Sequence, residues 1–400
     1  MKYVVVLGDG MADEPLEELG GKTALEYAAI DNINELAKKS EIGLCKTIPD
    51  GMAPGSDTAN LSVLGYDPKK YYTGRSSLEA LSVGVDMKDT DISFRCNIVT
   101  LSEEEDEYED KLIIDHSSGE ISTKEAAVLI NEVKKHFDNE MFQFYVGTSY
   151  RHLTIWNQGS MVDLSAPHDI LGKKITDYLP TNEYLKNMMV KSYEFLNNHP
   201  INIERAKKGL NKANSLWFWG PGTKPSMDLF EDKFDKKATM ISAVDLLKGI
   251  AVGSEMEVVK VDGANGSLNT NYEGKVEAAL KALLENGQDL AYIHVEAPDE
   301  MGHQGSIKDK VQAIEYLDSR VVKPLIDKLD SANTPYKILI MPDHPTPIRY
   351  RTHTSDPVPY LIYNSEKELN KTWNYNEREA KKSGTFIEQG YTLMKKFITE

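Results

Sequence analysis

Three short apolar runs, rich in β-branched residues, each end in a loop that carries an aspartate. The runs cover residues 3–7, 290–295 and 337–341, and the aspartates that follow them are Asp9, Asp299 and Asp343. Continuous apolar runs of this kind are typical of strands buried in a parallel sheet, where both faces are covered. Because ligands bind beyond the carboxyl ends of such strands, we expect the three carboxylates to converge there.

Helical patterns lie between the later runs. Apolar residues recur at helical spacing over 271–285 and again over 307–329. This alternation predicts an α/β fold with a mostly parallel sheet flanked by helices on both faces. A chain of 400 residues also exceeds what one compact core usually holds, which favours two domains or a large domain with an insertion.

The middle of the chain has a different pattern. It combines an acidic run, a hairpin edge, a helix and two strand-like segments, at 103–110, 111–116, 123–136, 142–146 and 153–156. We read this as a smaller α+β domain inserted at residues 86–209, with residues 1–85 and 210–400 forming the core domain.

The composition limits the classes of binding partner that we expect for this chain. The net charge of −17 repels polyphosphate backbones, and no basic run offsets it, so nucleic acid is not an expected partner. An anionic ligand would need local cations, metal ions or a few arginines. The two cysteines, Cys45 and Cys96, fit no disulfide framework or zinc motif, and no stretch approaches the ~20 apolar residues of a membrane span. We therefore expect a cytoplasmic protein without a membrane partner.

Histidines accompany the aspartates. Asp299 and His303 are spaced so that, on a helix, they share a face and could hold one metal ion, although an N-cap aspartate with an incidental histidine fits equally well. Asp343 and His344 follow a strand directly, and His353 comes nine residues later. Together these carboxylates and imidazoles suit Mn²⁺ or Zn²⁺ better than Ca²⁺, and they are enough for two ions. Two ions ~3.5–4 Å apart would clamp both oxygens of a displacement at phosphorus.

A serine supplies a candidate nucleophile. Ser56 follows Pro54-Gly55 at the expected start of a helix that runs through Leu61 and Leu64. Serine is favoured there simply as an N-cap, and that explanation is sufficient in isolation. A helix N-terminus also suits a phosphate, so a serine activated by metal could attack phosphorus and form a phosphoserine.

Taken in order, these motifs resemble the alkaline-phosphatase superfamily and, within it, cofactor-independent (2,3-bisphosphoglycerate-independent) phosphoglycerate mutases of the shorter, archaeal-type branch. The core motifs are Gly8-Asp9-Gly10, Gly55-Ser56-Asp57-Thr58-Ala59-Asn60, Pro298-Asp299 with His303, Pro342-Asp343-His344 and Thr352-His353-Thr354. In the insertion they are Gly74-Arg75, Phe94-Arg95 with Asn97, and Tyr150-Arg151-His152. The resemblance covers nearly the whole chain and implies an alkaline-phosphatase-like core.

The resemblance also implies a metal-dependent mechanism. Asp299, His303 and His353 would hold one divalent ion, and the second would be held by Asp9, Ser56, Asp343 and His344. Mn²⁺ is favoured, with Zn²⁺, Co²⁺ or Mg²⁺ as alternatives. Ser56 would take the phosphoryl group from 3-phosphoglycerate, and the 2-hydroxyl of the retained glycerate would take it back. Retaining glycerate would require the two domains to close, so the resemblance implies that the insertion binds substrate and covers the site.

Several residues of the insertion are candidates for binding this substrate. Arg151 is the first choice for the carboxylate or phosphate, followed by Arg75, Arg95 and His152. Each arginine could instead cover apolar surface or pair with an acidic residue. His116 could move a proton between hydroxyls, but it is equally explained as a turn residue, with His152 as a competitor. His168 lies in a turn-like segment and His294 is read as an interior histidine, so neither is included.

Two other activities use the same core. Relatives of the shorter branch include proposed homoserine kinases, and a phosphotransferase of that type would need the metal site to hold a nucleotide because the chain has no P-loop. A metal-dependent phosphomonoesterase is the other alternative. The sulfatase signature is absent around Ser56. The oligomeric state is not predicted by the sequence.

Overall fold

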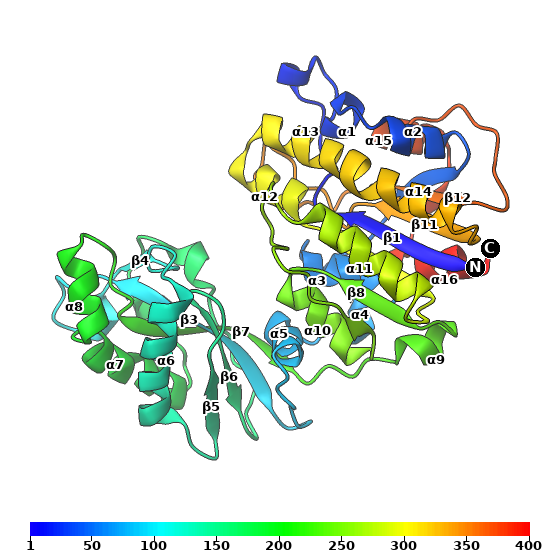
Figure 1. Cartoon of the computed structure of the whole chain (residues 1–400). Coiled ribbons are helices and arrows are strands. Elements are labelled where there is room, and N and C mark those ends of the chain that lie inside the picture. The colour runs from blue at the N-terminus through cyan, green and yellow to red at the C-terminus, as the bar shows by residue number, and fades with distance from the viewer. The chain divides into compact units, whose positions relative to one another are not determined.

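The computed structural model describes residues 1–400, which divide into two compact units (Figure 1). The first unit comprises Met1–Tyr72 and Ser226–Glu400, and the second is Thr73–Pro225. The boundaries expected from the sequence, 85/86 and 209/210, need correction. Helix α5 (Arg75–Ser82) packs on strand β3 (Ile92–Leu101), and β7 (Ser215–Thr223) pairs with β3, so both flanking segments belong to the second unit.

The first unit contains an eight-stranded sheet in the order β13-β2-β12-β11-β1-β10-β8-β9. Its strands are β1 (Lys2–Gly8), β2 (Glu41–Cys45), β8 (Ala238–Ile241), β9 (Glu257–Val258), β10 (Leu290–Val295), β11 (Tyr336–Met341), β12 (Val358–Asn364) and β13 (Phe386–Ile387). Strand β1 lies between β10 and β11 and is parallel to both. Only β12 runs antiparallel to its neighbours. The predicted mostly parallel sheet is confirmed, and the three predicted strands are β1, β10 and β11.

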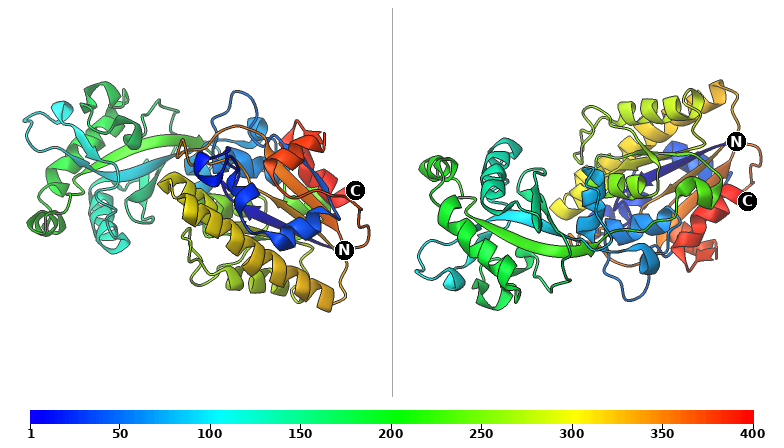
Figure 2. Two further views of the ribbon diagram at one scale, coloured as in Figure 1. Left: turned by 90° about the horizontal axis from the view of Figure 1, so that it is seen from above. Right: turned by 90° about the horizontal axis from the view of Figure 1, so that it is seen from below.

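The helices of this unit cover both faces of the sheet (Figure 2). They are α1 (Ala24–Tyr27), α2 (Asp31–Ala37), α3 (Ser56–Val63), α4 (Pro68–Tyr71), α9 (Phe230–Phe234), α10 (Asp245–Gly253), α11 (Tyr272–Leu284), α12 (Ala297–Gln304), α13 (Ile307–Tyr316), α14 (Lys323–Ser331), α15 (Glu377–Lys382) and α16 (Leu393–Thr399). A π-helical turn, Leu317–Val322, joins α13 to α14 within the single helix predicted there.

Alternate residues of each strand face opposite layers of helices. On one face, Val4 and Val6 of β1 join the core cluster that also contains Val276 of α11 and Ile314 of α13. On the other face, the ring of Tyr3 meets Phe397 of α16 edge-on, with centroids 5.6 Å apart. The sheet is therefore buried on both sides, which explains why its strands read as continuous apolar runs.

The second unit is built on an antiparallel sheet in the order β4-β3-β6-β5, with β7 paired to β3. Its remaining elements are β4 (Ile113–Asp115), α6 (Thr123–Phe137), β5 (Phe142–Tyr145), β6 (Arg151–Trp156), α7 (Glu183–Leu196) and α8 (Pro200–Lys207). Every residue of β3 is buried. The hairpin edge, helix and strands predicted for the middle of the chain are confirmed. No helix in either unit combines the length and hydropathy that crossing a membrane requires.

Candidate active site

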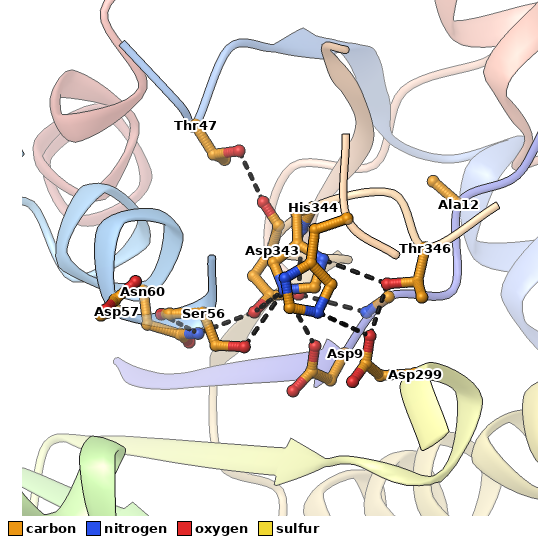
Figure 3. A network of polar contacts seen from close by, with 12 residues as sticks. Asp9, Ala12, Thr47, Ser56, Asp57, Asn60, Asp299, Asp343, His344 and Thr346 are labelled. Atoms are coloured by element: carbon orange, nitrogen blue, oxygen red, sulfur yellow. Dashed lines mark hydrogen bonds and ion pairs between the residues drawn. The ribbon is translucent and has the colours of Figure 1, made fainter. Parts of the chain in front are cut away.

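The carboxyl ends of three neighbouring strands place three aspartates together (Figure 3). Asp9 follows β1, Asp343 follows β11, and Asp299 lies in the first turn of α12, just beyond β10. All three are buried. Gly10 is needed between them because its φ is +60° and a Cβ there would lie 2.6 Å from Asp299 Oδ1. The convergence predicted from the three runs is therefore observed.

Asp299 lies against two histidines. Its Oδ2 is 3.2 Å from His303 Nε2, one helical turn along α12, and its Oδ1 is 3.4 Å from His353 Nε2. The Nε2 atoms of the two histidines are 3.0 Å apart. The contact with His303 and His353 holds the pKa of Asp299 well below its usual range, and Asp299 in turn raises the pKa of His303 to about 9. The predicted helical spacing of Asp299 and His303 is confirmed.

His344 lies between this group and the other two aspartates. Its Nε2 is 3.5 Å from Asp9 Oδ1 and 3.5 Å from Asp343 Oδ2. Its ring is also 4.0 Å from that of His353, and the candidate ligand atoms of His344, His353 and Asp299 lie within 4.8 Å of one another. His344, which the resemblance gave to the Asp9 and Asp343 group, is therefore within reach of both groups.

Ser56 is the first residue of α3, and its hydroxyl oxygen lies 3.1 Å from His344 Nε2. Gly55 occupies the N-cap position and no side chain caps the helix, so the explanation of Ser56 as an N-cap is wrong. Asn60, one turn later, donates from Nδ2 to the Ser56 carbonyl oxygen at 2.8 Å and to Asp343 Oδ2 at 2.8 Å. The helix terminus is thereby fixed to the strand-end aspartate, with the serine hydroxyl beside His344.

No lysine or arginine pairs with the three aspartates of this cluster. The ion-pair partners of the three aspartates are all histidines. Burial and the nearby carboxylates of Asp343 and Asp299 raise the pKa of Asp9 well above its usual range. Asp9 Oδ1 is buried and accepts no hydrogen bond. An unpartnered carboxylate oxygen surrounded by carboxylate and imidazole donors fits one or two divalent cations.

Two supporting residues were not predicted to belong to the site. His294, expected to be an interior histidine, is fully buried, but its Nε2 also lies 3.0 Å from Asp9 Oδ2. The hydroxyl of Thr346 bonds Asp299 Oδ1 and lies 3.3 Å from His344 Nδ1. A histidine inside an otherwise apolar strand was a signal for the first, because a buried imidazole needs polar partners. Nothing in the sequence marks Thr346.

The second unit gathers its own group of cationic side chains. The Nε atoms of Arg95 and Arg75 approach the Glu79 carboxylate at 3.0 Å and 3.4 Å. The guanidinium of Arg95 also lies over the ring of Trp219, 4.3 Å from its centroid. Burial lowers the pKa of Arg95 to about 10, which still leaves it charged at neutral pH. Both arginines were predicted from the sequence, whereas the role of Trp219 was not.

Aromatic and imidazole rings of the second unit lie next to these cationic side chains. The ring centroid of His116 is 5.6 Å from that of Tyr150 and 6.0 Å from that of His168, and Arg151 lies 5.3 Å from the Tyr150 centroid. His116 Nδ1 is buried without a hydrogen-bond partner. His168, left out of the sequence prediction, also contacts Trp219, with ring centroids 5.2 Å apart. Three arginines and two histidines are thus brought together.

Comparison with known proteins decides the family. Residues 37–202 match the family model described as 2,3-bisphosphoglycerate-independent phosphoglycerate mutase. A protein of that name from Methanosarcina barkeri is 47% identical over 388 residues, which are 96% of this chain and 95% of that protein. The chain belongs to the 2,3-bisphosphoglycerate-independent phosphoglycerate mutase family. The resemblance stated from the motifs is thereby confirmed.

Further relatives of this mutase family agree. A probable mutase of the same name from Geobacter sulfurreducens is 45% identical and covers 100% of both chains. Among solved structures, a protein from Pyrococcus horikoshii has a TM-score of 0.83 at 30% identity, with 99% of this chain and 96% of that one covered. The cofactor-independent phosphoglycerate mutase from Thermoplasma acidophilum has a TM-score of 0.66 at 25% identity, covering 100% and 99%.

One residue of this mutase family member that was predicted to bind substrate, His152, lies in the interior. His152 is buried inside the second unit, and its Nδ1 accepts a hydrogen bond from the Gly147 amide at 3.1 Å. Burial lowers the pKa of His152 to about 3, so the ring is neutral. Its Nε2 is also buried, without a hydrogen-bond partner, so the structure gives His152 no accessible face for a substrate. We correct the substrate-binding prediction for this residue accordingly.

Proposed function

We propose that this chain interconverts 3-phosphoglycerate and 2-phosphoglycerate through a phosphoserine at Ser56, next to two divalent cations. The observation that carries the proposal is the position of the Ser56 hydroxyl, 3.1 Å from His344 Nε2 at the edge of three buried carboxylates. A hydroxyl held there is placed for attack on phosphorus. The family to which the chain belongs supports the same substrate pair.

The ligand atoms favour two sites. Asp299, His303 and His353 would hold one ion, and a second site would comprise Asp9, Asp343, His344 and Ser56. Mn²⁺ is the favoured ion because carboxylate oxygen and imidazole nitrogen are mixed in both sets. When bound, such ions supply positive charge that neutralises phosphoryl oxygens and lowers the pKa of a neighbouring hydroxyl. The unpartnered Oδ1 of Asp9 supports an ion at the second site.

The remaining steps follow from the chain's own residues. The Ser56 oxygen attacks the phosphorus of 3-phosphoglycerate, the bond from phosphorus to the 3-oxygen breaks, and the proton lost by Ser56 ends on that oxygen. Glycerate then presents its 2-hydroxyl, whose oxygen attacks the phosphorus of the phosphoserine. The bond from phosphorus to the Ser56 oxygen breaks, and the proton of the 2-hydroxyl ends on that oxygen, which restores the free serine. No bisphosphoglycerate takes part. The N-terminus of α3 favours the phosphoserine because a helix N-terminus attracts negative charge.

The cationic group of the second unit is proposed to bind the anionic parts of the substrate. Arg151 is exposed, lies 5.3 Å from the centroid of the Tyr150 ring and forms no ion pair, which leaves its planar fork available for a carboxylate. Arg95 and Arg75 share Glu79, so they would add to the positive potential around it. Local cations are required because the chain as a whole carries −17. His116, with its unpartnered Nδ1, is the candidate for moving protons between the glycerate hydroxyls.

Phosphorus NMR of two reaction mixtures tests the proposal. The Mn²⁺-loaded protein is incubated with 3-phosphoglycerate and no bisphosphoglycerate, and a second sample receives homoserine and ATP. We expect 2-phosphoglycerate to form without matching release of inorganic phosphate, and no phosphohomoserine. Phosphate as the sole product would favour a phosphomonoesterase, and phosphohomoserine would favour the kinase. Ser56→Ala serves as the control and should form none of these products.

A further inference from the structure

Strand β10 carries two buried polar side chains that point toward the aspartates described above. Tyr292 and His294 are two residues apart, so they lie on the same face of the strand, and both have no exposed surface. The facing helix on that side is α3, which carries Ser56. Neither residue is among the ligands or nucleophiles proposed so far.

The hydrogen bonds of His294 fix which nitrogen carries its proton. Nδ1 lies 3.2 Å from the hydroxyl of Ser242, and that hydroxyl already accepts from the Val244 amide at 3.0 Å. The Ser242 proton is thus free to be donated to Nδ1. On the other side, Nε2 lies 3.0 Å from Asp9 Oδ2, and an ionised carboxylate, which is the form that binds a cation, can only accept. Both contacts are satisfied when Nε2 is protonated and donates to Asp9.

This bond determines which oxygen of Asp9 is available. Oδ2 is engaged by His294, whereas Oδ1 is buried without a hydrogen-bond partner, 3.5 Å from His344 Nε2. A neutral donor fixes the carboxylate without competing with a cation for its charge, as a lysine or arginine would. A ring nitrogen of His294 lies within 4.8 Å of carboxylate oxygens of both Asp9 and Asp343, so distance alone would allow it to bind an ion. Because its Nε2 proton is engaged by Asp9, we place His294 behind Asp9 rather than among the ligands.

Tyr292 acts in the same way on the second aspartate, through Asn60. Its hydroxyl donates to Asn60 Oδ1 at 2.7 Å, which fixes the orientation of the amide. Asn60 Nδ2 then donates to Asp343 Oδ2 at 2.8 Å and to the Ser56 carbonyl oxygen at 2.8 Å (Figure 3). One buried phenol therefore holds both an aspartate and the helix turn that presents the serine.

We infer that Tyr292 and His294 are positioning residues, which hold Asp343 and Asp9 through buried neutral hydrogen bonds so that these carboxylates bind one of the two divalent cations. The inference rests on the proposed two-ion site. The inference predicts different behaviour at the two ion sites, because the residues of the other site make no hydrogen bond to Tyr292 or His294. Those residues are Asp299, His303 and His353. Loss of the hydrogen bond from either residue should weaken the binding of one ion and leave the affinity for the other unchanged.

Binding of Mn²⁺ alone, followed by the EPR signal of the free ion, tests this without substrate. The samples are the unaltered protein, His294→Leu, His294→Gln and Tyr292→Phe. Glutamine carries an amide that can replace the Nε2 donor, while leucine removes it. Tyr360→Phe is the matched control, because Tyr360 is also a buried strand tyrosine but donates to Glu41, at 2.6 Å.

We expect His294→Leu to weaken one of two bound ions by roughly 10–100-fold and to leave the other at its original affinity. His294→Gln should lie within about threefold of the unaltered protein, Tyr292→Phe should weaken the same ion by about 10-fold, and Tyr360→Phe should have no effect. Should His294→Leu fail to fold, Ser242→Ala, which removes the donor to Nδ1, replaces it and should weaken the same ion.

Two results would overturn the inference. One is unchanged affinity for both ions in His294→Leu and Tyr292→Phe. The other is a His294→Gln protein as weak as His294→Leu, which would make the imidazole itself a ligand. If the unaltered protein bound no Mn²⁺ at all, the proposed two-ion site would be refuted, and the inference with it. Normal Mn²⁺ binding without mutase activity would contradict the proposed function and leave the positioning role standing.

Discussion

Lys310 and Asp13 form an ion pair inside the first unit, and we predict that Lys310→Met lowers the free energy of unfolding by about 3–5 kcal/mol. Both side chains are fully buried, and Lys310 Nζ lies 2.8 Å from Asp13 Oδ2. The same ammonium donates to the carbonyl oxygens of Thr346 at 2.8 Å and Ala12 at 3.3 Å. It therefore ties together the loops that follow β1 and β11.

The magnitude follows from what methionine leaves behind. Methionine fills most of the lysine volume but removes the charge, so the Asp13 carboxylate stays buried with only the amides of Glu14 and Ile348 as donors. Breaking a buried pair in this way typically costs 3–5 kcal/mol. Asp13→Asn in the same protein removes the stranded charge. The double variant should therefore recover about 1–3 kcal/mol relative to the sum of the single changes.

Urea unfolding of the ion-free protein in EDTA measures these values, and hydrogen exchange of the β11 peptides assigns them to the first unit. Lys323→Met is the matched control, because Lys323 pairs with Asp327 on an exposed surface, and it should cost less than about 0.5 kcal/mol. The reasoning would be refuted if Lys310→Met cost less than about 1 kcal/mol, or if the single losses simply added in the double variant.

Three further predictions concern the substrate, the acid limit and the metal. Arg151→Ala should raise KM for 3-phosphoglycerate by about 30-fold, which corresponds to the loss of one charge-assisted hydrogen bond of about 2 kcal/mol. The number of Mn²⁺ ions bound should stay the same. An unchanged KM would show that Arg151 does not bind the substrate. Burial lowers the pKa of His152 to about 3, below its unfolded value of ~6.5, so the stability it contributes is complete above pH ~6.5 and is lost as pH falls toward 3. In EDTA, His152 should therefore lower the free energy of unfolding at pH 5 by about 2 kcal/mol relative to pH 8. His152→Asn should reduce the difference measured between the two pH values by about that amount, and identical pH profiles of the two proteins would contradict this. Mn²⁺ at 100 times its Kd should stabilise the EDTA-treated protein by about 2.7 kcal/mol per site in urea unfolding, and no stabilisation would mean that the folded chain does not bind the ion.

The sequence predicted the parts of the site that depend on short-range patterns. The runs before Asp9, Asp299 and Asp343 have the composition of strands buried on both faces, and the carboxyl ends of such strands must share an edge. The spacing of Asp299 and His303 required only that α12 be helical, which it is. These features are local, so a single sequence is enough to recognise them.

What the sequence did not predict depends on contacts between distant segments. The boundary of the second unit was misplaced because β7 pairs with β3, more than a hundred residues earlier, and no local pattern records that pairing. His152 was taken for a substrate residue because its motif lies beside Arg151, yet neighbours along a strand face opposite sides. The role of His294 likewise depends on Asp9, which follows the adjacent strand β1.

Mass spectrometry of the acid-quenched enzyme tests the central claim most directly. The Mn²⁺-loaded protein is mixed with 3-phosphoglycerate, quenched during turnover and digested. We predict a phosphoryl group on the peptide that contains Ser56, absent from Ser56→Ala and absent without substrate. A phosphoryl group on any other residue, or full mutase activity in Ser56→Ala, would contradict the account.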